Sequence, residues 1–63
     1  MMHRDPMNDV RRLYVCESGP ERHAWAARSM RDVIDWKPAG ETTRVVVFNR
    51  NGDQWVKDQE FEL

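Results

Sequence analysis

The sequence predicts a small α+β domain in the order β-α-β-β, with a three-stranded antiparallel sheet and one helix packed on one face. Three observations predict this fold. Residues 11–17 favour a strand, apolar residues over 20–36 have helical spacing, and an Asn-Gly pair follows the β-branched run at 43–50. Residues 1–9 show no periodicity, so we expect a flexible N-terminal arm before a single domain over 10–63.

The first predicted strand, over 11–17, is rich in β-favouring residues. Leu13 and Val15 project to one side of this strand, and Tyr14 and Cys16 project to the other. Cys16 is the only cysteine, so an internal disulfide is impossible. A domain this small usually needs an additional stabiliser. Oligomerisation or partner binding is therefore expected to supply it.

A helix is predicted from Pro20 to Trp36. Ser18 and Glu21 have the spacing of a capping box, and proline is tolerated in the first helical turn. The helix is expected to end at Trp36 because the residue before Pro38 is disfavoured in the α region. At about 100° per residue, one stripe forms the core face. Its members are His23, Ala26, Ala27, Met30, Val33 and Ile34.

The second half of the chain predicts a β-hairpin with strands over 43–50 and 53–60. Asn51-Gly52 favours a type I′ turn, which needs positive φ at both central positions. This turn sets Phe48 directly opposite Trp55 as an aromatic cross-strand pair. The first strand then lies either parallel to 43–50 or, as we favour, antiparallel beside 53–60.

The predicted hairpin is apolar on both faces. One face carries Val45, Val47 and Val56, and the other carries Val46, Phe48 and Trp55. One helix covers only one of these faces, whereas a sheet with a solvated face should alternate more cleanly. We therefore expect the uncovered face to bind a partner or to form a homodimer. In the alternative, the loop over 37–42 and the chain ends fold across it.

Two tryptophans are predicted to share the side of the helix away from the core. Trp25 and Trp36 project within about 20° of each other, with Ser29 and Asp32 between them. In the alternative, Trp36 covers the edge of the core and Trp25 covers the first loop. Tryptophan is enriched among interface hot spots. The predicted partner-binding residues are Trp25, Ser29, Asp32, Trp36, Phe48 and Trp55.

Composition and residue spacing argue against several function classes. Ten basic and eleven acidic residues give a net charge of −1, the wrong sign for a protein that binds phosphate backbones. Apolar runs are too short to span a membrane, and the first residues have no signal-peptide pattern, so a cytoplasmic protein is expected. His3, His23 and Cys16 lack metal-ligand spacing, so neither metal nor cofactor is expected. Cys16 and His23 lack an orienting third group, so we expect no enzyme.

The order of strand, alanine-containing helix and hairpin resembles that of some small phage-encoded anti-CRISPR proteins. The resemblance runs from Pro20 onward, and its specific part is Asn51-Gly52 followed by Trp55-Val56. It implies a non-enzymatic protein that binds a bacterial defence complex and blocks it, and no functional residue is carried over. The sequence thus predicts a protein-binding module that occupies a surface on a larger partner. The alternative is a small dimeric nucleic-acid-associated regulator, suggested by arginines near Tyr14 and Trp55.

Overall fold

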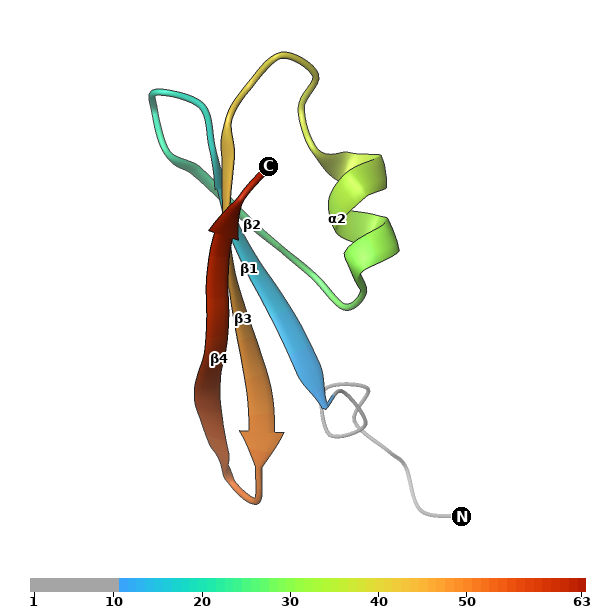
Figure 1. Ribbon diagram of the computed structural model, residues 1–63, viewed down its shortest axis with the longest axis vertical. Helices are drawn as coiled ribbons and strands as arrows, with labels where there is room; N and C mark the ends of the chain where they lie inside the picture. Colours follow the sequence, from blue (N-terminus) through green and yellow to red (C-terminus); the bar gives the residue numbers. More distant parts are fainter. Residues whose placement is uncertain (1–10) are drawn as a thin grey trace.

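The computed structural model describes residues 11–63, which form one antiparallel sheet with a helix on one face (Figure 1). The elements are β1 (Arg12–Ser18), β2 (His23–Ala27), α2 (Met30–Trp36), β3 (Thr43–Asn51) and β4 (Gln54–Glu62). The strand order is β2-β1-β3-β4. The predicted α+β class is confirmed, but the prediction of three strands is wrong because the sheet has four. The predicted arm over 1–9 lies outside the described residues.

The helix predicted over 20–36 is wrong in its first half, because residues 23–27 form β2. The connection from β1 to β2 is a tight turn, in which the Arg22 amide donates to the Gly19 carbonyl at 3.1 Å. Gly19 and Arg22 have φ values of +74° and +54°. Pro20 is the second residue of this turn, where its ring presets the φ that a β-turn requires. The residues predicted to start a helix therefore form the turn of a β-hairpin between β1 and β2.

The additional strand changes the position of β1 in the sheet. β1 lies antiparallel beside both β2 and β3, and not beside β4 as predicted. The physical reason is chain direction: β2 reverses the chain once before the helix, so β3 returns antiparallel to β1. β2, α2 and β3 thus form a crossover unit with β1 inserted between its two strands.

The helix is a two-turn element with a defined start and end. Ser29 is its N-cap, and the Ser29 hydroxyl accepts a hydrogen bond from the Asp32 amide at 3.1 Å. The helix ends at Trp36 as predicted, two residues before Pro38. Val33 is fully buried and attaches the helix to the sheet.

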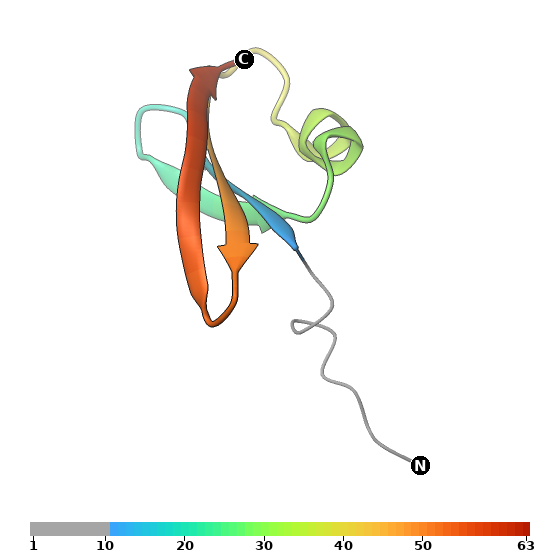
Figure 2. The ribbon, with the colours of Figure 1, turned by 60° about the horizontal axis from the view of Figure 1, so that its bottom comes forward.

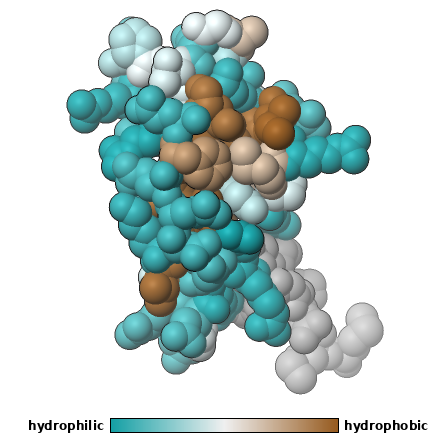
Figure 3. All heavy atoms as spheres, in the orientation of Figure 1, coloured by the Kyte–Doolittle hydropathy of each residue, from teal (hydrophilic) through white to brown (hydrophobic). Residues whose placement is uncertain are grey.

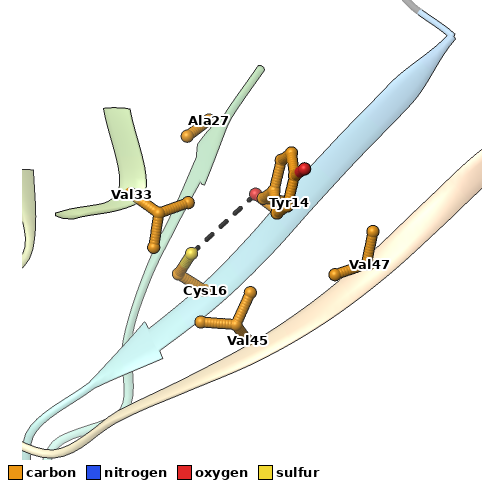
Figure 4. Packing of buried hydrophobic residues seen from close by; sticks show 6 residues of the cluster. All are labelled: Tyr14, Cys16, Ala27, Val33, Val45 and Val47. Carbon is orange, nitrogen blue, oxygen red and sulfur yellow. Dashed lines mark hydrogen bonds between the residues drawn. The ribbon is translucent and has the colours of Figure 1, made fainter. Parts of the chain in front are cut away.

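The core lies between α2 and the face of the sheet turned toward it (Figure 4). Its buried apolar residues are Tyr14, Cys16, Ala27, Val33, Val45 and Val47. Of the predicted core residues, Ala27 is buried but belongs to β2, and Met30 packs only partly against the cluster. Ile34, predicted to be buried, is 61% exposed. The helix is too short to bury a full stripe, and it contacts the sheet chiefly through Val33.

Polar side chains at one margin of the core are fully hydrogen-bonded. The Trp25 indole Nε1 donates to the Ser18 hydroxyl at 2.8 Å, and this hydroxyl shares a second hydrogen bond of 2.8 Å with the Thr43 hydroxyl. Ser18 and Thr43 are both buried. This chain of bonds links β2, β1 and β3 at one point, and it holds Trp25 against the sheet.

The predicted hairpin of β3 and β4 is present, but its turn is centred one residue further along the chain. Asn51 pairs with Gln54, so Gly52 and Asp53 are the central residues. Gly52 has a φ of +63°, and among the described non-glycine residues only Arg22 has a positive φ. Positive φ at the first central position alone is typical of a type II′ turn rather than the predicted type I′.

The shifted turn changes the cross-strand partners. Phe48 lies opposite Lys57 and Trp55 lies opposite Arg50, so the predicted direct pairing of Phe48 with Trp55 is wrong. The two aromatic side chains still share one face and are diagonal neighbours. A bulge follows Lys57, where Asp58 is the unpaired extra residue of β4. The sequence pattern carries no signal for this bulge.

Candidate functional site

The sheet has an inner face toward α2 and an outer face turned away from it (Figure 2). No described segment lies over the outer face, and residues 37–42 run from α2 back to β3 at one end of the sheet (Figures 1 and 2). The strand registers place Val45, Val47 and Val56 on the inner face. The prediction of a sheet with apolar residues on both faces is therefore confirmed.

The centre of the outer face is apolar. The registers set Leu13 beside Phe48 and Val15 beside Val46, and these four side chains are half-buried. Trp55 follows at the margin and is 36% exposed. These five residues form a continuous apolar area on adjacent strands, which we call the outer patch.

Charged residues occupy the two ends of the outer face, and their signs differ. At one end lie Arg11 and Arg50, and Lys57 lies beside Phe48 in the same half of the face. At the other end lie Glu17, Arg44 and Glu62, and Glu60 lies beside Val46 in that half. The face is therefore electrostatically polarised along the strand direction, even though the whole chain is nearly neutral.

Ion pairs on the exposed edge strand β4 oppose its pairing with a strand of another chain. Glu60 contacts Arg44 and Lys57, each at 2.8 Å, and Asp58 contacts Arg12 at 2.9 Å. Hydrogen bonds from Arg44 and Lys57 lower the pKa of Glu60 to about 2. Charges and a bulge on an edge strand discourage pairing with another chain. Self-association through the β4 edge is thus disfavoured.

We expect Glu60 to contribute to stability above its ordinary pKa of 4.5 and to lose this contribution as the pH falls toward about 2. Stability falls as the pH falls because the pKa of Glu60 is lower in the folded state than in the unfolded state. The pair is exposed, so the effect should be small and should weaken in salt. NMR titration of the Glu60 carboxyl carbon should give a low pKa that Arg44→Gln raises. Arg31→Gln, which removes an ion pair on α2 instead, should leave it unchanged.

A second apolar area lies on the helix side of the molecule. Figure 3 shows apolar atoms gathered between α2 and the C-terminal end of β4. Ile34, Trp36 and Leu63 are the large exposed apolar residues of these segments, and Trp36 is 58% exposed. Met30 and Phe61 are partly buried against the core. We call these five residues the helix-side residues.

The structure separates the predicted partner-binding residues. Trp25 points from β2 into the core margin, so its predicted place beside Trp36 on an exposed helix face is wrong. The reason is that residues 23–27 alternate as a strand. The Ser29 hydroxyl caps the helix by accepting from the Asp32 backbone amide. Ser29 and Asp32 do not lie between two tryptophans, because Trp25 belongs to β2. Trp36 is exposed at the end of the helix.

The other two predicted residues, Phe48 and Trp55, do lie together on the outer face. Sequence reasoning did not assign Leu13 and Val15 to this site, although the alternation within 11–17 placed both on one side of their strand. It also placed Ile34 in the core. A helix start at Ser29, which the Ser29 to Asp32 spacing permits, would have left Trp25 outside the helix and separated it from Trp36.

Cys16 and an open surface cleft are the features of the described residues that bear on the predicted absence of catalysis. Cys16 is fully buried, and burial raises the pKa of its thiol, so the thiolate that would act as a nucleophile is disfavoured. An open cleft of about 520 Å³ between the loops 19–22 and 40–42 has mixed charge, from Glu17, Arg22, Glu41 and Arg44. Within 11–63, no group of three or more His, Cys, Asp or Glu side chains could hold a metal ion.

No helix in the described part of the chain is long and apolar enough to cross a membrane. Comparisons of this chain with protein-family models, with curated proteins and with solved structures gave no match.

Proposed function

We propose that this chain is a non-enzymatic protein-binding module that acts by occupying a surface on a larger partner. The observation that supports this proposal best is the exposure of Trp36 and Ile34 on a helix of only seven residues. Large apolar side chains grouped at the surface are typical of interaction sites. Tryptophan in particular supplies much of the binding energy at interfaces.

The helix side suits a foreign partner because its polar and apolar groups are close together. Arg31 and Asp35 form an exposed ion pair on the same helix that carries Ile34 and Trp36. Binding would bury the two apolar side chains and leave the ion pair at the rim of the interface. The charged groups would stay in contact with water there, so binding would not require their desolvation. A phage inhibitor of a bacterial defence complex is the most specific form of this proposal, and a phage or defence-system gene neighbourhood would favour it.

We expect Trp36→Ala to weaken binding to the partner by about 30-fold or more, because truncating a hot-spot tryptophan costs at least about 2 kcal/mol. A pull-down from a lysate of the source organism would identify the partner, and titration calorimetry would then measure the affinity of each variant. Arg31→Ala is the matched control, since it changes an exposed residue of the same helix. Equal affinity of Trp36→Ala and wild type, with both folded by circular dichroism, would contradict the helix-side site.

A second candidate function is a small nucleic-acid-associated regulator, and the basic end of the outer face favours it. Arg50 stacks on Trp55 at 6.0 Å, and Arg11 and Lys57 lie nearby on the same face. Aromatic and basic side chains on an open sheet can stack and hold single-stranded bases. Such binding should weaken steeply with salt, whereas an interface anchored by Trp36 should not.

A further inference from the structure

We propose that the outer face binds the outer face of a second copy of this chain, with the strands of the two copies antiparallel and the basic end of each over the acidic end of the other. The proposal rests on the function proposed above, in that it assigns one of the module's two apolar areas to self-association. The helix-side residues of both copies then remain available to a larger partner.

The apolar centre supplies the contact between the two copies. Leu13, Val15, Val46 and Phe48 occupy two adjacent rows at the middle of the sheet, on its two central strands. Sheets that pack face to face interdigitate such residues with their strands roughly aligned. In the antiparallel arrangement, a two-fold axis between the two rows sets Leu13 against Val15 of the other copy, and Phe48 against Val46 of the other copy. The apolar area is thus complementary to itself.

The charges at the two ends select this arrangement over the alternative. The same two-fold axis sets Arg11 against Glu17 of the other copy. It also sets Lys57 against Glu60 of the other copy, but these two residues already pair with each other within one chain. A two-fold axis along the strands would instead bring the arginines at the basic end of both copies together. Like charges across an interface oppose binding, and opposite charges fix its orientation. Arg44 and Arg50 also approach, but Arg44 is neutralised by Glu60 and Arg50 stacks on Trp55.

Arg11 and Glu17 can pair between copies, and within one copy Glu17 interacts electrostatically with Arg44, which lies opposite it on β3. The structure gives the side chains of Arg11 and Glu17 no ion pair within residues 11–63, and both are exposed. Residues 11–63 also include few buried apolar side chains, and small domains commonly gain stability from oligomerisation. Charge complementarity of the face with itself therefore favours a second copy over an unrelated protein.

The size of the face sets the expected affinity. A strand of seven residues and a sheet of four strands span about 24 Å by about 19 Å, or about 450 Å² of flat area. Stable interfaces bury about 800 Å² on each partner. The dimer should therefore be reversible, with a dissociation constant in the micromolar range. It should form fully at about 1 mM and separate at about 1 µM, a range that sedimentation can cover.

The first test is sedimentation equilibrium of the full chain and of Val46→Lys over this concentration range. Placing a charge at the apolar centre should raise the dissociation constant by about 100-fold or more. Circular dichroism should show the same fold for both proteins. A monomeric wild type at about 1 mM would overturn the proposal. A dimer that persists unchanged in folded Val46→Lys would also overturn it, because that dimer would use an edge or the helix side.

The second test is charge reversal, which probes orientation and does not depend on the first variant. Glu17→Arg should raise the dissociation constant about tenfold, because two attractive contacts in each dimer become repulsive. Adding Arg11→Glu to Glu17→Arg should restore the wild-type value, since each pair is again of opposite charge. A double variant that dimerises more weakly than Glu17→Arg alone would refute the antiparallel arrangement.

The same proteins separate this inference from its alternatives. Trp36→Ala should dimerise like wild type even where it loses the larger partner, so the two proposals can fail independently. Fluorescence anisotropy with a labelled single-stranded oligonucleotide tests the nucleic-acid alternative. A chain that remains monomeric and binds the oligonucleotide through Trp55 and Arg11 would replace the dimer with the nucleic-acid function.

Discussion

Trp25→Ala is expected to remove most of the net stability of the fold at room temperature. Removing an aromatic side chain that packs against a core costs about 3 kcal/mol or more. The change also removes the indole donor to the Ser18 hydroxyl. A domain of this size has only about 3–5 kcal/mol of net stability to lose. Far-ultraviolet circular dichroism and urea titration of dilute protein would measure the loss.

Two variants serve as controls for Trp25→Ala. Trp36→Ala removes an exposed indole and should change the unfolding free energy by less than about 0.5 kcal/mol. Trp25→Phe keeps an aromatic ring and loses one hydrogen bond, so it should cost about 1–2 kcal/mol. If Trp25→Ala were as stable as Trp36→Ala, then β2 would be wrongly placed and the tryptophans would be equivalent, as on the predicted long helix.

Val33→Ala is expected to lower the unfolding free energy by about 2–3 kcal/mol. Val33 is the one residue of α2 that is fully buried, and it contacts the core formed by β1 and β3. The change removes two methyl groups from a closed site, and the short helix has no other fully buried anchor to compensate. Chemical denaturation monitored by circular dichroism would give the difference.

Ile34→Ala is the matched comparison, because Ile34 is adjacent in sequence and 61% exposed. It should cost less than about 1 kcal/mol, since most of its surface already contacts water. The ratio of the two losses of unfolding free energy shows which side of α2 faces the sheet. A larger loss in Ile34→Ala than in Val33→Ala would mean that the helix packs through the opposite flank.

Part of the fold follows from local signals in the sequence. The hairpin near Asn51-Gly52 forms because β-branched residues flank a glycine that tolerates positive φ. The helix ends at Trp36 because Pro38 disfavours continuation. The apolar outer face also follows, because Val46, Phe48 and Trp55 alternate with core residues along their strands. Each of these features depends on residues that are close together in the chain.

What the tertiary structure alone decided is the conformation of residues 20–29 and the register of the final hairpin. Ser18, Pro20 and Glu21 suit a helix start as well as a tight turn, so local propensity does not choose between them. Residues 23–27 become a strand because they pair with β1. This pairing provides hydrogen-bond partners for the backbone groups of β1 on the side away from β3. It also places the Trp25 indole within hydrogen-bond distance of the Ser18 hydroxyl. The bulge at Asp58 is likewise a property of the paired strands, not of either strand alone.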